Sequence, residues 1–365
     1  MSNYILGVNI SHHPSLALLK DGELVYYLED DRWNRIKEEE WQLTSNIRSI
    51  MDLLKYTRHI DHVIFASFCK DETYDAPDRY MIEVVKKQLD QYKITYDKIY
   101  YYREHHLYHA CSAFYGSGFD EAAALVLDGG GAYFRDYAQL RESETMYYFS
   151  DIGKVDLVKR VYTPQFILNE DPPVKINDNE ILSSTMSCGW IFNTISFTIC
   201  TNSPGKTMGL SPYGSLDDLQ NEEWFYYDES VDCWLTNNKT ILNTYRRCYN
   251  DPDFVPHGDV LQPDFIFDVG AKLAKKAQIE TKNHTIRLIQ DLIDKTQSKN
   301  VVLSGGYFLN CVNNYEYIKA FPEINFFIDP TSHDGGIAIG SAKYVWHHLL
   351  NNKTKYPLET LYLGG

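Results

Sequence analysis

The segment from Ala122 to Gly131, AAALVLDGGG, is the most informative part of the chain for its architecture. It is an apolar, strand-like run that ends in an aspartate and glycines, and two more strand-like segments, TMYYFSD and KVDLVKRVY, follow it. The chain begins in the same way, because YILGVNIS is followed by SLALLKDGELVYYLEDD, in which Lys20-Asp21-Gly22 predicts a hairpin turn. A pattern that restarts along the chain predicts a duplicated fold unit.

The remaining segments alternate between strand-like and helical patterns, which is typical of an α/β protein. A charged region with helical periodicity at 46–56 precedes an expected strand at 62–68, a helix at 76–92, a strand at 98–103 and a helix at 105–115. Further along, we expect a buried helix at 181–200, a loop at 202–214, a polar, irregular insertion at 215–262, a helical region near 263–297, strands that run into glycines within 300–310 and 324–336, and a helix at 336–350. We interpret residues 1–120 and 121–355 as two lobes, with a nucleotide cleft at the carboxyl ends of their strands.

The composition predicts a globular, cytoplasmic protein. With 365 residues, 44% of them apolar, the chain can bury a sizeable core. Its start has neither a basic region nor a small-residue cleavage site, and no apolar run approaches the roughly 20 residues that span a bilayer. The seven cysteines are scattered without C-x-x-C spacing, which fits a reducing compartment. Because the net charge of -15 repels polyanions, we expect no nucleic-acid polymer as a partner. The lack of a spanning run likewise predicts no membrane.

The segment EHHLYHACSAF contains three histidines but otherwise reads as an ordinary buried helix. His105 and His109 are four residues apart and share one helix face, whereas His106 points elsewhere. An isolated pair of this kind is more often a pair of core or capping histidines than a metal site. Here, however, Asp128 ends the next strand and Asp334 lies in a glycine-flanked turn, so four ligands could converge. Imidazole and carboxylate ligands without a thiolate suit Fe(II), Zn or Mn.

Three glycine-containing segments, DGGG (128–131), PGKTMG (204–209) and SGG (304–306), present backbone N–H groups that can bind a phosphate. Any one of them alone is usually just a turn. None matches a P-loop, and no strand is followed by G-x-G-x-x-G. Together with the histidine pair, the three segments favour a nucleotide site.

Two residues near the start of the chain are further candidates for chemistry. His13 lies at the tip between the first two expected strands, and Lys37 lies in the charged run EDDRWNRIKEEE. Such a run is usually a solvated face. In the functional alternative, Lys37 binds a phosphate or carbonyl oxygen and His13 accepts a proton near neutral pH.

Five stretches resemble the NodU/CmcH-type O-carbamoyltransferases, relatives of the hydrogenase-maturation carbamoyltransferase and of the tRNA threonylcarbamoyl-transfer enzyme. They are ILGVNISHHPSLALLKDGELVYYLEDDRWNRIK, EHHLYHACSAFYGSGFDEAAALVLDGGG, GKTMGLSPYG, LSGGYFLNCVNN and SHDGGIAIGSA. They occur in family order, span nearly the whole chain and are highly specific together. The resemblance implies an actin/hexokinase-like ATPase fold, in which two ribonuclease-H-like lobes surround a nucleotide cleft.

The resemblance also implies an activity. Family members make carbamoyladenylate from carbamoyl phosphate and ATP in one domain, and in the other they transfer the carbamoyl group to a hydroxyl of a small molecule or nucleotide. The four candidate ligands named above would hold a metal ion, with iron favoured over Zn and Mn, that touches the nucleotide. His13 and Lys37 would lie near the transfer centre. The residues that would surround the adenylate are Asp128, Gly129, Gly130, Lys206, Gly209, Ser304, Gly305, Gly306 and Asn310.

The chain departs from the family pattern in three respects. His13 is followed by Pro14 where an aspartate is usual, and His333 stands where a glycine is common. The segment YPLETLYLGG (356–365) resembles the junction at which the adenylate-forming domain of the family begins. We therefore expect that domain in a longer chain or in a separate protein, and expect this chain alone to transfer from carbamoyladenylate but to make it poorly.

Two other functions fit parts of the sequence. A sugar or acid kinase would share the fold but does not need the His-x-x-x-His helix. A non-enzymatic module would bind a nucleotide without transferring a carbamoyl group. The acceptor is not defined by the sequence, because the tyrosine-rich insertion at 215–262 fits a pocket lining and ordinary surface packing equally well.

Overall fold

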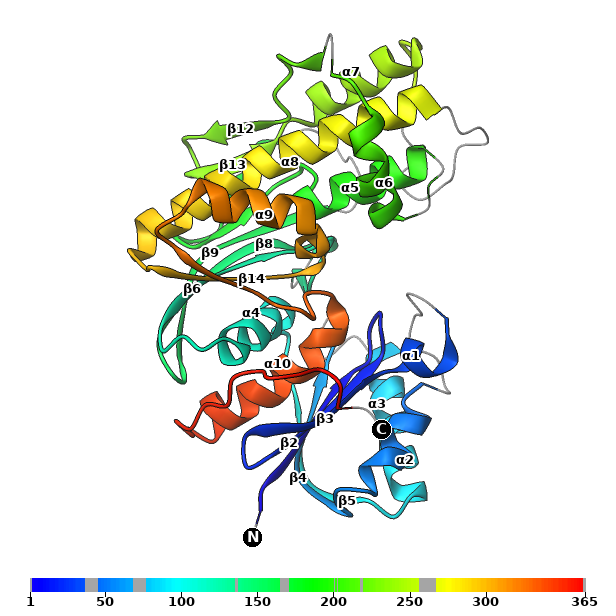
Figure 1. Cartoon of the computed structure of the whole chain (residues 1–365), viewed down its shortest axis with the longest axis vertical. Coiled ribbons are helices and arrows are strands. Elements are labelled where there is room, and N and C mark those ends of the chain that lie inside the picture. The colour runs from blue at the N-terminus through cyan, green and yellow to red at the C-terminus, as the bar shows by residue number, and fades with distance from the viewer. Residues whose placement is uncertain are drawn as a thin grey trace.

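The structure, a computed structural model, describes residues 2–36, 45–67, 77–134, 137–164, 171–199, 201, 203–216, 219–255 and 267–363. Lys37 lies outside the described residues. Within them the chain forms two large β-sheets, each covered by helices on both faces (Figure 1). No helix of this described part is both long and apolar enough to cross a membrane.

The first sheet has the strand order β3-β2-β1-β4-β5. The strands β1, β2 and β3 are antiparallel, with the expected hairpin between β2 and β3, whereas β4 and β5 run parallel to β1. Helices α2 and α3 cover one face of this sheet and α10 covers the other. The bounds are β1 (Tyr4–Asn9), β2 (Ser15–Lys20), β3 (Glu23–Glu29), α1 (Asp30–Asn34), α2 (Ile47–Leu53), β4 (His59–Ala66), α3 (Pro77–Gln91), β5 (Thr95–Tyr101) and α10 (Ile337–Tyr344).

The second sheet repeats this topology in its central strands, which have the order β9-β8-β6-β14-β15. Again the first three strands in sequence, β6, β8 and β9, are antiparallel, and β14 and β15 run parallel to β6. The duplication expected from the sequence is therefore confirmed. The bounds are β6 (Ala122–Leu127), β7 (Tyr133–Phe134), β8 (Tyr137–Asp151), β9 (Lys154–Pro164), β10 (Val174–Lys175), β11 (Glu180–Leu182), β14 (Asn300–Ser304) and β15 (Asn325–Ile328).

The alternation of side chains along β6 separates two hydrophobic cores. Ala123, Leu125 and Leu127 face α5 (Cys188–Thr198) and α8 (Phe267–Thr296), while the alternate residues of β6 face α4 (His105–Gly116). A strand that is apolar on both faces is expected when helices cover both sides of a sheet. Figure 1 shows α4 and α10 lying between the two sheets. Both helices therefore bring residues to the junction of the lobes.

Three expectations about local structure are wrong. The stretch at 202–214, expected as a loop, forms α6 (Pro204–Leu210) and a 3-10 turn (Ser211–Tyr213). Proline is favourable in the first turn of a helix because its missing N–H has no partner to lose there. Residues 180–182 form β11, so the helix expected from residue 181 begins only at Cys188. Within 215–262, regular structure is present as β12 (Phe225–Asp228), β13 (Cys233–Thr236) and α7 (Asn238–Tyr249).

Most of the other expected elements agree with their expected positions to within a few residues at each end. However, β8 begins at Tyr137, well before the expected segment TMYYFSD (145–151), and α1 and α9 were not expected. The expected helical region near 263–297 is α8, and the strand within 300–310 is β14, which leads into a 3-10 helix (Gly306–Leu309) and then α9 (Cys311–Ala320). The expected last helix is α10, extended by a π-helical turn (Val345–Leu349).

Candidate metal and nucleotide site

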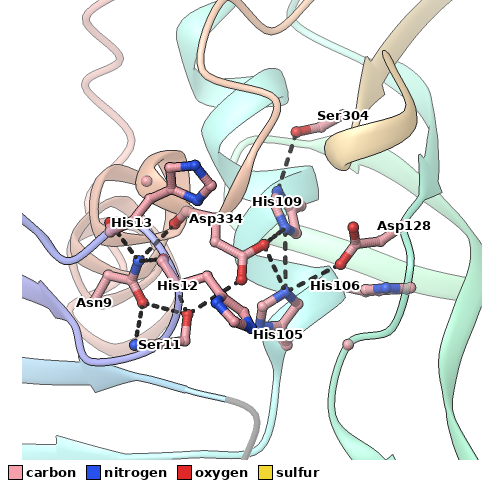
Figure 2. A network of polar contacts seen from close by, with 12 residues as sticks. Asn9, Ser11, His12, His13, His105, His106, His109, Asp128, Ser304 and Asp334 are labelled. Carbon is pink, nitrogen blue, oxygen red and sulfur yellow. Dashed lines mark hydrogen bonds and ion pairs between the residues drawn. The ribbon is translucent and has the colours of Figure 1, made fainter. Parts of the chain in front are cut away.

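Four side chains from three separate segments converge at the junction of the lobes (Figure 2). His105 and His109 lie one turn apart on α4, and their Nε2 atoms are 3.2 Å apart. Asp128 directly follows β6, and Asp334 begins a 3-10 helix after β15. The His105 Nε2 atom lies 3.6 Å from a carboxylate oxygen of each aspartate, and His109 Nε2 lies 3.6 Å from Asp334 Oδ1. All four residues offer a ligand atom within 4.8 Å of the others.

The donor set fits a divalent cation. Both imidazoles are fully buried, and two Nε2 atoms this close cannot both direct a proton at the other. Burial by itself would lower the pKa of His105, but the carboxylates of Asp334 and Asp128 raise it to about 9. Burial would likewise raise the pKa of Asp334, yet the histidines hold it well below its ordinary value. Two ionised carboxylates and two imidazoles therefore face one point, which a cation of the Fe(II), Zn or Mn type would neutralise.

A second layer of polar groups orients the ligands. Ser304, at the end of β14, lies 3.4 Å from His109 Nδ1 and 3.2 Å from Asp329 Oδ2. This contact to Nδ1 leaves Nε2 of His109 directed at the cluster, which is how metal-binding histidines are commonly oriented. His106 does face elsewhere, because its Nδ1 atom lies 2.7 Å from Thr145 Oγ1.

The turn after β1 holds Asp334 in place (Figure 2). The buried amide nitrogen of Asn9 lies 2.8 Å from the carbonyl oxygen of His12, 3.0 Å from that of His13 and 3.0 Å from that of Asp334. The Ser11 hydroxyl lies 3.2 Å from Asp334 Oδ2. The sequence interpretation missed these two residues; the available signal was a polar residue, Asn9, at the end of an otherwise apolar strand.

A pocket of about 780 Å³ opens beside the cluster. Asp128 and Asp334 line it together with Trp190 and Asn193 of α5. Two expected phosphate-binding turns contribute Gly129, Gly130 and Gly306 to its lining. Gly305 lies behind the second turn with φ of 98°, a conformation that favours glycine, and a Cβ there would come within 2.2 Å of the Leu127 carbonyl oxygen.

The structure brings some of the sequence-predicted residues to this pocket and leaves others away from it. His13, Asp128, Gly129, Gly130, Gly306 and Asp334 line it, and His105, His109 and Ser304 lie directly behind. Lys206 and Gly209 are exposed on α6 and do not line it, although Pro204, Gly205 and Met208 of the same helix do. Asn310 is buried, caps α9 and exchanges hydrogen bonds with Gln278, so its amide is used within the protein.

His13 lines the same pocket as Asp334. Its ring packs edge-on against that of His333, with centroids 4.7 Å apart. Burial, and then the neighbouring His333, lower the pKa of His13 despite the opposing effect of Asp334. The imidazole is therefore neutral at neutral pH and can accept a proton. His333, in turn, contacts Glu29 at 3.2 Å.

The sequence interpretation also missed Arg141. This residue of β8 lines the pocket although its side chain is largely buried. A single arginine within a long strand has no motif around it, so the only signal was a cation in the segment that follows DGGG.

Comparisons with known proteins agree with this architecture. Residues 65–343 match the family model described as "Carbamoyltransferase N-terminus". The uncharacterized protein sll1178 of Synechocystis is 26% identical over 96% of this chain and 58% of its own length. The nodulation protein NolNO of Sinorhizobium fredii is 22% identical over 97% of this chain and 49% of its own length. The chain thus spans about half the length of the curated relatives it matches.

Two solved structures share the fold at low sequence identity. Full-length HypF in its phosphate- and nucleotide-bound form has a TM-score of 0.58 at 14% identity, over 93% of this chain and 55% of that one. The HypF of T. kodakarensis has a TM-score of 0.55 at 12% identity, over 94% of this chain and 47% of that one. The actin/hexokinase-like ATPase fold expected from the sequence is confirmed.

Proposed function

Because the chain belongs to the carbamoyltransferase family, we propose that it transfers a carbamoyl group from carbamoyladenylate to a hydroxyl of a small molecule or nucleotide. The observation that carries this proposal is the convergence of two histidines and two aspartates at the edge of a pocket lined by glycine turns. A kinase of the same fold has no need for such a ligand set. A hydroxyl acceptor would reach the carbamoyl carbon from the pocket side of the cluster.

In this proposal His105, His109, Asp128 and Asp334 hold a divalent cation, with Fe(II) favoured over Zn and Mn. When bound, such a cation acts as a Lewis acid that polarises a carbonyl or phosphoryl oxygen. The backbone N–H groups of the turns at Gly129–Gly130 and Gly306 bind the adenylate phosphate. Ser304 and Asn9 keep the ligands in place before the substrate arrives.

His13 has the role of general base. Its Nδ1 atom is buried and has no hydrogen-bond partner among the described residues, and its pKa is lowered, so the ring is available for a proton. The imidazole takes the proton of the acceptor hydroxyl as the oxygen attacks the carbamoyl carbon. The C–O bond to the phosphate then breaks, which yields the carbamate ester and AMP. Lys37 near the transfer centre stays a prediction from the sequence.

The activation step is assigned to a separate unit. In our proposal, carbamoyl phosphate and ATP form carbamoyladenylate in an adenylate-forming domain that acts in cis or in trans. The relatives are about twice as long as this chain, which supports a second unit in the complete system.

The test supplies carbamoyladenylate directly to the purified chain with Fe(II), Zn²⁺ or Mn²⁺ and a panel of hydroxyl compounds. Mass spectrometry of carbamate products, together with AMP release, measures the transfer. We expect His109→Ala to lose both the metal and the transfer, whereas His62→Ala, on β4 away from the cluster, keeps both. Phosphorylation of an acceptor by ATP, without any carbamate, would instead support a kinase. Nucleotide binding without transfer, even with an activating partner, would indicate a non-enzymatic module.

A further inference from the structure

The side chain of Arg141 is fixed in the wall of the pocket. It is only 8% exposed, and its Nε atom donates to the Gly131 carbonyl oxygen at 2.9 Å. The guanidinium carbon lies 4.8 Å from the centre of the Tyr133 ring. A side chain anchored at both points holds its charge in one place, unlike a flexible surface arginine.

The guanidinium lies directly against the glycine turn after β6. A Cβ on Gly130 would come within 3.0 Å of Arg141 Nε and 3.2 Å of its Cδ and Cζ atoms, so the absence of a side chain at Gly130 creates the space that Arg141 fills. Arg141 and Gly130 both line the pocket. The glycine turn and the Arg141 guanidinium can therefore donate hydrogen bonds to the same ligand in the pocket.

The neighbouring residue on the strand supports the same turn from behind. Successive strand residues point to opposite faces, and Glu142 accepts hydrogen bonds from the backbone N–H groups of Ala132, at 3.1 Å, and His106, at 3.3 Å. Its other oxygen lies 3.2 Å from Arg160 Nε. The Glu142 carboxylate is thus used behind the turn, while Arg141 faces the pocket in front.

We propose that Arg141 binds phosphate oxygens of the pocket's nucleotide ligand and makes the pocket selective for phosphorylated ligands over nucleosides. This rests on the proposed function, because it requires that a nucleotide binds here. A guanidinium presents several N–H donors in a planar fork that matches phosphate oxygens. Lys206, which the family resemblance predicts around the adenylate, is exposed on α6 outside the pocket lining, whereas Arg141 lines the pocket.

The test compares the affinities of ADP, AMP and adenosine for the full chain loaded with Mn²⁺, measured by isothermal titration calorimetry. Arg141→Gln should weaken ADP binding by about ten- to a hundredfold, as expected for a lost charge-assisted hydrogen bond, and should leave adenosine binding within about twofold. Arg141→Lys keeps the charge but loses the planar set of N–H donors. Its ADP affinity should therefore lie between those of the wild type and Arg141→Gln. Arg287→Gln, on α8 outside the pocket lining, makes the same change of charge and should match the wild type.

Each outcome bears on the inference. Equal ADP affinity in wild type, Arg141→Gln and Arg141→Lys would overturn it, as would an equal loss of ADP and adenosine, which indicates a purely structural role. If Arg141→Gln does not fold, as judged by its melting transition, the ratio of ADP to adenosine affinity in Arg141→Lys decides. A wild-type protein that binds neither ligand would contradict the proposed function itself, and this inference with it.

Discussion

The two lobes have the same strand order, yet the turns after their first strands differ in what they offer. After β1, Asn9 and Ser11 use their side chains to hold backbone carbonyls and the carboxylate of Asp334. After β6, the turn offers the carboxylate of Asp128 followed by glycines that expose their backbone to the pocket. The turn after β1 therefore orients a candidate metal ligand, Asp334, that comes from elsewhere in the chain. The turn after β6 supplies a candidate metal ligand of its own, Asp128, and part of the pocket surface.

This difference shows how a duplicated fold can build an asymmetric site. Equivalent strands bring both turns to the same junction, so the position comes from the topology. The chemistry comes from the few residues after each strand, which can diverge because they are not part of either core. Substitutions in the two turns should therefore separate the loss of a metal ligand from the loss of its orientation.

The largest effect on metal affinity should follow from removing the candidate metal ligand in the glycine turn after β6. Asp128→Asn keeps the shape of the side chain but removes a carboxylate charge next to His105. We expect metal affinity to fall by more than the roughly 10- to 100-fold typical of outer-layer changes, and carbamoyl transfer to fall with it. Metal content by elemental analysis and the transfer rate are the two measurements. Asp97→Asn, at an exposed aspartate of β5 outside the cluster, makes the same change of charge and is the control. Retention of full metal content by Asp128→Asn would exclude Asp128 as a ligand.

A smaller effect should follow from the orienting turn. Asn9→Ala removes the amide that joins the β1 turn to Asp334 but leaves all four ligands. Metal affinity should fall by about 10- to 100-fold, since outer-layer partners fix ligand geometry rather than supply it. Titration with Co²⁺, read by its absorption spectrum, measures this. Asn325→Ala, an exposed asparagine on β15, is the control. If Asn9→Ala binds metal as tightly as this control, the two turns do not differ in the way described here.

The same contrast explains which parts of the site could be predicted from sequence. The four candidate ligands were accessible because each has a local signature: two histidines at helical spacing, and two aspartates beside glycines. Asn9 and Arg141 were missed, since their roles depend on partners far away in the chain. Ser304 was predicted beside the adenylate, but its contact with His109 joins residues too far apart in the chain for a local pattern to reveal. A contact between residues 9 and 334 is created by the packing of α10 on the first sheet, which no local pattern contains.

The fold was predictable because its signal is repeated. Apolar strands, a hairpin and glycine-rich strand ends occur twice, so errors in single elements did not change the topology. One of the errors fell where turn-forming residues occur inside regular structure. In α6, Pro204 and Gly205 suggested a loop. The segment is nevertheless helical, because proline is tolerated in the first turn of a helix and tertiary packing stabilises the rest. The family resemblance predicts Asn310 near the adenylate, and this stays a prediction; in the structure its side chain caps α9.

A third prediction concerns the glycine turn without touching its carboxylate. Gly130→Ala places a methyl group against the guanidinium of Arg141, which must move. We expect weaker ADP binding, by less than in Arg141→Gln, with metal affinity unchanged because Asp128 stays in place. Calorimetry with ADP and a Co²⁺ titration separate the two effects. Gly118→Ala, where a Cβ would meet nothing within 4 Å, is the control. A parallel loss of metal affinity would show that the turn and the ligand are not independent.

The smallest effect concerns α10, which follows Asp334 and packs on the first sheet. Lys343 of α10 donates to the carbonyl oxygens of Gly22 and Tyr356, and burial, then the nearby Lys355, lower its pKa to about 8. The unfolded chain holds this proton up to about pH 10.4, so between about pH 8 and 10 it binds more protons than the folded protein. The contribution of Lys343 to stability should therefore rise with pH across this window.

Urea unfolding of the wild type and of Lys343→Met at several pH values measures that contribution as the difference between the two. Lys355 has a similarly lowered pKa and titrates in the same window, but it is present in both proteins and largely cancels in the difference. We expect the free energy of unfolding of the wild type to increase relative to that of Lys343→Met from about pH 8 to pH 10. A difference that stays constant over this range would mean that Lys343 has an ordinary pKa. The two carbonyl contacts of the Lys343 ammonium would then offset the cost of its burial, and its contribution to stability would not depend on pH in this window.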